Sequence, residues 1–199
     1  MFPFRPFRRA VLRRAATHYA EHGWDVVPGA CLAGGRFVCE EAGCHAVTCH
    51  PANASWEAAA GHDSAKVRAA WHRPYGVLLA TGRGVDAFEV TAGLGRFALG
   101  QAQGPVAVAP SGRWIFLVRP SRRRHRELLD RSDVVLHSAN SWVVLPPTPL
   151  PDGRMRWEVD PDEVGWRLPD PDALQVLLLT AARTLAPPLV PRTSFVQAA

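Results

Sequence analysis

Two acidic residues, Asp86 and Glu89, lie in a predicted strand that follows a glycine-rich turn in "LLATGRGVDAFEVTAGLG" (78–95). An enzyme that uses two divalent ions for nucleotidyl transfer needs carboxylates that can bridge or flank ions about 3.5–4 Å apart. However, side chains alternate between the faces of a strand, so Asp86 and Glu89 should point to opposite sides, while Glu89 shares its face with Ala87 and Thr91. By itself, the stretch therefore offers one carboxylate and one hydroxyl on a common face.

A second group of reactive side chains lies in "CLAGGRFVCEEAGCHAVTCHP" (31–51). Thiolates and imidazoles at short spacing are the ligands that tetrahedral Zn²⁺ prefers. The spacing predicts a structural zinc site formed by Cys39, Cys44 and His50, with Cys31 or Cys49 as the fourth ligand. The alternative is that these cysteines are ordinary small buried or loop thiols.

The composition is that of one globular domain, which we place at 1–184, followed by a disordered tail at 185–199. The chain has a formal net charge of +5, and Lys66 is its only lysine among 23 Lys and Arg residues. This charge suits a polyanionic partner, although a GC-rich genome also produces Arg-rich proteins. No apolar run approaches the roughly 18–20 residues of a membrane span, and the N-terminus lacks the features of a signal peptide. We therefore expect a cytoplasmic protein without disulfides.

The elements that must position these residues alternate between helices and strands, which predicts a mixed α/β (α+β) fold. A hairpin around "PSG" and a final apolar helix close the pattern. The predicted helices are 8–22, 62–73, 92–102, 121–131 and 172–185, and the predicted strands are 24–28, 75–80, 85–90, 104–110, 113–120, two pieces within 133–147, and 155–159. Asp63 or Ser64 is the expected N-cap of the second helix.

The order of these pieces resembles the N-terminal domain of bifunctional DNA primase–polymerases, in the archaeo-eukaryotic primase superfamily. The similarity runs from about Ala15 to Thr180. It is carried by "AATHYAEHGWDVVPG", "CHP", "VRAAWHRPYGVLLATGRG", the acid strand, "VAPSGRWIFLV" and "SANSWVVLPPTP". The resemblance implies a nucleotidyl-transfer site in a cleft between two α/β halves, one of them a recognition-motif-like antiparallel sheet.

The same resemblance implies that catalytic residues have been lost. The family carries two aspartates separated by one residue, and these positions match Glu89 and Thr91. Its Ser-Gly-Gly turn matches Ser111 and Gly112 with one glycine missing, and the histidine that follows the turn matches Trp114. A further catalytic aspartate matches Val135, with Asp133 two residues away on the same face. The resemblance therefore implies an eroded site, which Asp86 and Asp133 could restore only in part.

Three functions stay open at this point. The first is a stand-alone primase–polymerase-like protein with weakened or lost catalysis that binds single-stranded DNA or RNA, or nucleotide triphosphates. The second is an active enzyme that uses Mg²⁺ or Mn²⁺ with an altered acid set. The third is a zinc-stabilised interaction module. The expected phosphate-binding residues are Arg83, Ser111, Gly112 and Arg113, with Trp114 as a stacking platform for bases.

Overall fold

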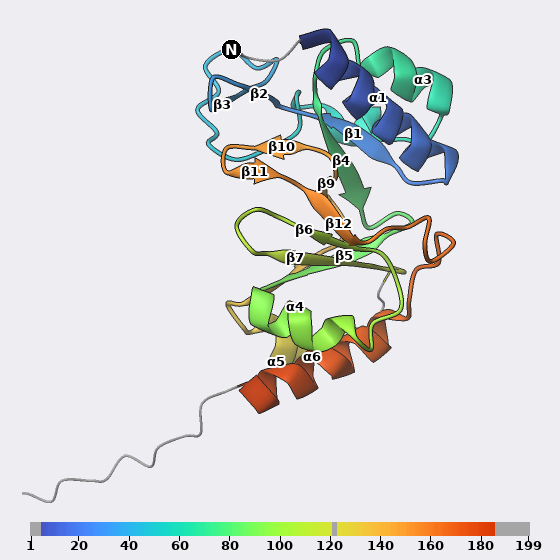
Figure 1. The fold of residues 1–199 in the computed structure, drawn as a ribbon, viewed down its shortest axis with the longest axis vertical. Helices are drawn as coiled ribbons and strands as arrows, with labels where there is room; N and C mark the ends of the chain where they lie inside the picture. The colour runs from blue at the N-terminus through green and yellow to red at the C-terminus, as the bar shows by residue number, and fades with distance from the viewer. Residues whose placement is uncertain (1–4, 121–122, 186–199) are drawn as a thin grey trace, which may run out of the picture.

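The structure, a computed structural model, describes residues 5–120 and 123–185 of the 199-residue chain (Figure 1). Helices and strands alternate, and both larger sheets are antiparallel. The elements in chain order are α1 (Arg5–Glu21), β1 (Val26–Gly29), β2 (Cys31–Ala33), β3 (Arg36–Val38), α2 (Trp56–Ala59), α3 (Ser64–Ala70), β4 (Gly76–Thr81), β5 (Asp86–Val90), α4 (Ala92–Leu99), β6 (Val106–Val108), β7 (Trp114–Val118), α5 (Arg126–Leu129), β8 (Val134–His137), β9 (Ser141–Leu145), β10 (Pro149–Leu150), β11 (Gly153–Arg154), β12 (Arg156–Val159) and α6 (Pro171–Leu185).

The larger sheet has the strand order β12-β6-β7-β5-β8. The acid strand β5 lies between β7 and β8, and Glu89 is directly opposite Ile115 on one side and Val135 on the other. Because side chains alternate along each strand, this register decides which of them share a face. One face of the sheet is covered by α4 and α6, which lie below it in Figure 1.

The helix-covered face is filled by large apolar side chains from the sheet and from α6. Phe88, Phe116 and Leu178 are fully buried there. Helix α6 begins where the Asp170 carboxylate accepts hydrogen bonds from the backbone N–H groups of residues 172 and 173, which is a typical N-cap. Burial of one leucine side chain contributes about 1.5–3 kcal/mol, so this layer anchors the C-terminal helix to the acid strand.

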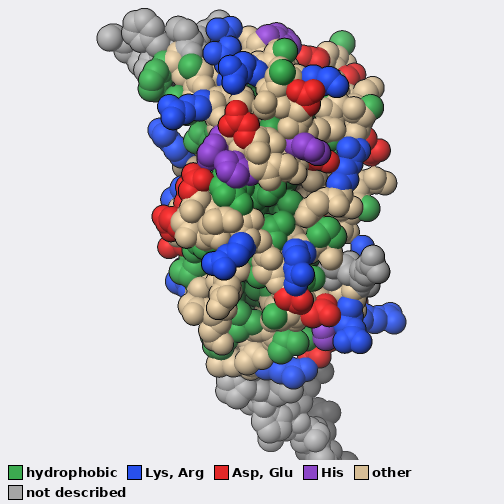
Figure 2. Space-filling view, turned by 90° about the vertical axis from the view of Figure 1, so that its right-hand side faces the viewer, with side chains coloured by type: hydrophobic (Ala, Val, Ile, Leu, Met, Phe, Trp, Pro, Cys, Tyr) green, Lys and Arg blue, Asp and Glu red, His purple; other side chains and the backbone are tan. Residues whose placement is uncertain are grey.

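A smaller sheet, with the order β1-β4-β9, lies beside α1 and α3. Its core includes Tyr19 from α1, Trp71 after α3 and Leu145 from β9. The same core contains Ile115 and Leu117 from the larger sheet. The face of that sheet that points away from α4 and α6 therefore packs against the elements above it in Figure 1. Figure 2 shows the side that carries α1 and α3, where Lys and Arg side chains are interspersed with Asp, Glu and His.

The structure confirms the predicted mixed α/β class and the antiparallel sheets, while the two-half arrangement implied by the resemblance stays a prediction. Asp63 is the N-cap of α3, since its carboxylate accepts hydrogen bonds from two N–H groups of the first turn. In the described part of the chain, no helix is long and apolar enough to cross a lipid bilayer.

Two local predictions were wrong. The cysteine-rich segment 31–51, for which the sequence predicts no strand, contains the β2–β3 hairpin, whose tight turn uses Gly34 and Gly35, both with positive φ. The helix expected at 121–131 is only the four-residue α5, and residues 121–122 lie outside the described chain. Of the predicted tail, Leu185 ends α6, and 186–199 also lie outside the described residues.

Candidate functional site

The face of the larger sheet opposite α4 and α6 carries polar side chains from the acid strand β5 and from its neighbours β7 and β8. Glu89 and Thr91 share this face with Arg113, because Arg113 directly precedes β7 opposite Thr91. His137 on β8 lies opposite Ala87 and projects to the same side. One carboxylate, one guanidinium and one imidazole from three neighbouring strands therefore meet on one face.

Both carboxylate oxygens of Glu89 are bound to cationic or potentially cationic groups. Arg113 Nε donates to Oε1 at 2.8 Å, and His137 Nε2 lies 3.0 Å from Oε2. Arg113 also donates to the backbone oxygens of Glu89 at 3.1 Å and of Asp133 at 3.4 Å. On its other side, His137 Nδ1 lies 3.1 Å from Ser141 Oγ, which fits a histidine that donates through Nε2 and accepts from the serine hydroxyl.

This environment favours the ionised form of Glu89. The hydrogen bond from His137, followed by that from Arg113, lowers the pKa of Glu89 to about 2, although desolvation acts in the opposite direction. The Glu89 side chain is 26% exposed and that of Arg113 25% exposed, so the ion pair is only partly screened by solvent. Glu89 is therefore a permanent anion at neutral pH whose charge is already neutralised.

The three residues line a pocket of about 340 Å³ between the two sheets. The residues around them come from the cysteine-rich segment (Thr48, Cys49), the β6–β7 turn (Ala109, Ser111), β9 (Ser141, Trp142, Val143, Val144) and Ile115, Leu150 and Met155. Its volume is near the lower end of the roughly 300–1,000 Å³ found for small-ligand sites. Glu89 is the only carboxylate among the described residues that line this pocket.

The other acidic positions do not join Glu89. The Asp133 carboxylate is held by Arg131 through two contacts of 2.8 Å, which lower the pKa of Asp133. Asp86 is 2% exposed and lies three residues before Glu89, on the opposite face of β5. Thr91 is the N-cap of α4, and its backbone N–H donates to the backbone carbonyl oxygen of Asp133. Among the described residues, no second acidic side chain therefore lies beside Glu89.

Arg113 and Trp114, the two residues after the β6–β7 turn, project from opposite faces of the sheet. Trp114 is only 6% exposed and packs against α4, where an added Cβ on Gly95 would lie 2.4 Å from the indole Cγ, so little of its ring is accessible to a base. Arg113, one residue earlier, projects from the other face of the sheet and lines the Glu89 pocket. Ser111 also lines the pocket, and Gly112 has the positive φ that the turn requires.

Arg83 and the preceding turn do not reach this pocket in the structure. Arg83 donates to the backbone oxygens of Glu57 at 2.7 Å and Ala60 at 3.4 Å. Gly82 has φ of +87°, and a Cβ there would lie 2.3 Å from the backbone of Ala139. The glycine of this turn therefore serves the close approach of two chain segments.

His137 and Trp142 are the site residues whose positions the sequence did not reveal. Neither residue is among the candidates of the sequence analysis, yet both line the pocket, and Trp142 is half-buried there. Strand periodicity offered a signal for His137, because it lies two residues after Val135 and hence on the same face. Nothing local distinguished that histidine from the other histidines of the chain.

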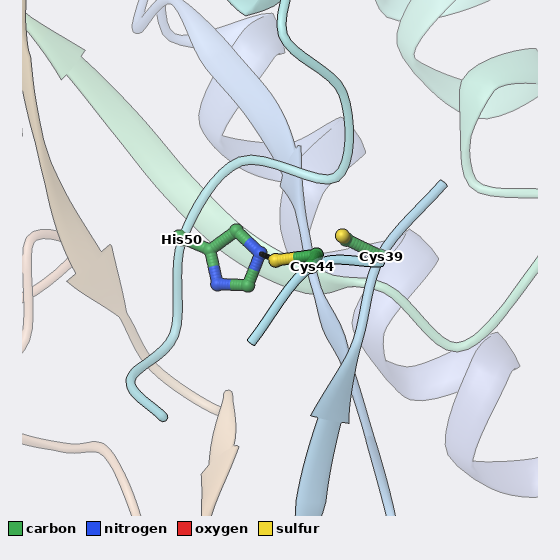
Figure 3. A group of neighbouring side chains, drawn as sticks. All are labelled: Cys39, Cys44 and His50. Carbon is green, nitrogen blue, oxygen red and sulfur yellow. Dashed lines mark hydrogen bonds between the residues drawn. The ribbon is translucent and has the colours of Figure 1, made fainter. Parts of the chain in front are cut away.

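The cysteine-rich segment places three potential metal ligands close together (Figure 3). Ligand atoms of Cys39, Cys44 and His50 all lie within 4.8 Å of one another, and Cys44 Sγ is 3.4 Å from His50 Nε2. Two sulfurs and one imidazole nitrogen at such separations fit around a tetrahedral ion with bonds of about 2.0–2.3 Å. These residues could therefore bind a metal ion.

The two remaining cysteines are not part of this group. Cys31 begins β2 and is buried in the core, 5% exposed. Cys49 is buried against Gly29 and Gly76, and burial raises its pKa to about 12. Neither of the expected fourth ligands thus lies beside the other three, because both side chains are used in packing.

Comparison with known protein families supplies the context for this geometry. The family model described as bifunctional DNA primase/polymerase, N-terminal, matches residues 16–174. No similar sequence was found among the curated proteins with which the chain was compared. The matched range spans all of the strands that form the pocket, and it agrees with the resemblance inferred from the sequence. This chain belongs to the family of bifunctional DNA primase/polymerase N-terminal domains.

Proposed function

We propose that this protein binds nucleic acid or nucleotides in the Glu89 pocket and that its nucleotidyl transfer is weakened or lost. The family in general acts on nucleic acid and nucleotides with divalent metals. The observation that carries the proposal is that both oxygens of Glu89 are occupied by Arg113 and His137. A metal ion would have to compete with a guanidinium for a carboxylate, and no other carboxylate lines the pocket in the described chain.

The polar groups that remain suit anion recognition rather than metal-assisted chemistry. Arg113 is partly exposed, and its bonds to Glu89 and Asp133 use three of its five N–H donors, so two N–H groups remain for a phosphate. Ser111 contributes a hydroxyl at the β6–β7 turn. Trp142, half-buried at the pocket wall and 5.3 Å from Trp56 between ring centroids, offers an aromatic surface on which a base could stack.

Primer-synthesis and primer-extension assays with Mg²⁺ and with Mn²⁺ test the catalytic part of the proposal. We expect no product, or only weak Mn²⁺-dependent product, from the wild-type chain. Robust synthesis that disappears in Glu89→Ala would refute the proposal and favour the active enzyme with an altered acid set. The binding part is tested by the affinity for single-stranded DNA, which should fall steeply with salt. No binding at about 50 mM salt would favour the interaction module.

A variant with added carboxylates beside Glu89 tests why metal-dependent catalysis would be weakened or lost. Val135 lies directly opposite Glu89, and such pairs have Cβ atoms about 4.5–5.5 Å apart. Thr91 lies two residues from Glu89 on the same face. In Thr91→Asp/Val135→Asp, three carboxylates would crowd this face, so we expect lower stability that Mn²⁺ restores. The uncharged Thr91→Asn/Val135→Asn is the matched control and should not respond to Mn²⁺.

We further propose that Cys39, Cys44 and His50 bind a structural Zn²⁺. When bound, the metal would cross-link a segment that has little core of its own, and such binding can contribute roughly 10 kcal/mol or more to folding. The support is the proximity of three ligands of the preferred types. Metal analysis of protein purified without chelators would refute the proposal if it found less than stoichiometric zinc.

A further inference from the structure

A second pocket, of about 410 Å³, lies next to the Glu89 pocket on the other side of the β6–β7 turn. Helix α4, the turn and the β11–β12 segment surround it. Among the described residues that line it, the charged ones are all arginines: Arg96, Arg154 and Arg156. A recess whose charged groups are all cationic favours a negatively charged ligand.

Two of these arginines are available to a ligand. Arg156 forms an ion pair with Glu158 on its own strand. Arg96 and Arg154 are exposed, and neither has an acidic side chain within 4.0 Å in the described part of the chain. A guanidinium without a carboxylate partner keeps its full set of donors for a phosphate, which it can bind in a bidentate manner.

The two pockets lie on either side of the β6–β7 turn and share one lining residue. Ala109, at the start of the β6–β7 turn, lines both of them. The β10–β11 turn packs on this turn, since an added Cβ on Gly153 would lie 3.1 Å from Pro110 Cγ. In Figure 1 both turns project on the same side of the molecule, above α4.

Strand alternation divides the β11–β12 segment between the two pockets. Met155 lines the Glu89 pocket, whereas its neighbours Arg154 and Arg156 line the basic one. A chain that leaves Arg113 and Ser111 across the turn therefore reaches the pocket that Arg96 and Arg154 line. Each pocket thus offers arginine side chains, and a polymer of phosphates is long enough to contact both.

We propose that single-stranded nucleic acid bound in the Glu89 pocket continues across the β6–β7 turn and that Arg96 and Arg154 bind its phosphates. This inference rests on the proposed function, because it extends the same site. Each pocket is small, so a nucleotide occupies one of them and only a longer chain engages both. The length of the ligand thus decides whether Arg96 and Arg154 contribute to affinity.

The test compares Arg96→Glu/Arg154→Glu with the wild-type chain by fluorescence anisotropy. The probe is a labelled oligothymidylate of roughly 16 nucleotides, a length at the upper end of single-strand site sizes. We expect its affinity to fall roughly tenfold or more at about 50 mM salt, and the log–log salt slope to become shallower by about 1.4, or about 0.7 per lost phosphate contact. Binding of a nucleoside triphosphate should change less than about twofold.

The matched control is Arg14→Glu/Arg68→Glu. These two arginines lie on α1 and α3, have no acidic partner within 4.0 Å in the described chain, and the variant lowers the net charge by the same amount. We expect less than about a threefold loss of affinity from it. Thermal melts followed by circular dichroism establish that each variant is folded.

The outcomes separate this inference from the proposed function. If the wild-type chain binds the oligonucleotide and both double variants weaken binding equally, binding follows overall charge and the inference is wrong. It is also wrong if Arg96→Glu/Arg154→Glu binds as the wild-type chain does. If the wild-type chain does not bind the oligonucleotide at all, the nucleic-acid part of the proposed function fails together with it.

Discussion

Replacement of Glu89 by glutamine should change how the stability of the protein depends on acid. In the folded chain, His137 and Arg113 lower the pKa of Glu89 from 4.5 to about 2. A group with a lowered folded-state pKa stabilises the protein above its unfolded-state pKa and loses that contribution as the pH falls through the folded-state value. The contribution of Glu89 should therefore be complete above about pH 5 and absent near pH 2.

The magnitude follows from the same shift. At about 1.4 kcal/mol per pKa unit, a lowering to about 2 corresponds to roughly 3 kcal/mol of stability at neutral pH. Partial exposure of the ion pair makes this an upper value. Breaking a buried pair by removing one partner typically costs about 3–5 kcal/mol, so the two arguments agree in scale. Glu89→Gln should therefore be less stable by about 2–3 kcal/mol at pH 7.

The assay is urea unfolding followed by tryptophan fluorescence between pH 2 and 7. The quantity of interest is the unfolding free energy of the wild-type chain minus that of Glu89→Gln, since carboxylates common to both proteins cancel in this difference. It should shrink toward zero as the pH falls from about 5 to about 2. The control variant Glu21→Gln removes an equal charge from a residue without an ion pair in the described chain. A difference that stayed constant over this pH range would refute the assigned role of the Glu89 cluster.

Two further predictions concern the metal ligands and the packing under the acid strand. Cys44→Ser should lose the bound zinc and unfold at a lower temperature, whereas Cys49→Ser should keep its zinc. Metal analysis and thermal melts measure the two effects. Equal zinc loss in both variants would contradict a metal site formed by Cys39, Cys44 and His50. Gly95→Ala should destabilise the protein by roughly 2–4 kcal/mol because its Cβ would collide with Trp114. On the same helix, Gly93→Ala meets only a contact at 3.8 Å and should stabilise by up to about 1 kcal/mol, so chemical denaturation should show opposite signs.

Much of the larger sheet could be predicted from the sequence. The strand periodicity of β5 indicated that Glu89 and Thr91 share a face and that Asp86 lies on the other one, and the register confirms this. The cap of α3 and the apolar helix α6 were equally local, because they depend on residues within one or two turns. The family could be inferred since the order of such segments is a property of the chain itself.

The contents of the pocket depended on contacts between distant segments. Arg113 was expected to bind phosphate, but nothing in the sequence indicated that it pairs with Glu89, 24 residues away. His137 is 48 residues from Glu89, and Trp142 reaches the pocket through β9, a strand of the other sheet. In the same way, four cysteines of similar local character separated into two metal-ligand candidates and two core residues.

The sequence by itself determined the family, the class of fold, the face of each strand and the absence of carboxylates at Thr91 and Val135. Tertiary structure alone decided that the remaining carboxylate is neutralised by Arg113 and His137. Periodicity records which side a residue faces, because it follows from the backbone geometry of one strand. Which partner stands opposite is set by register and by the packing of sheets, where a shift of one residue exchanges a buried tryptophan for an arginine in the pocket.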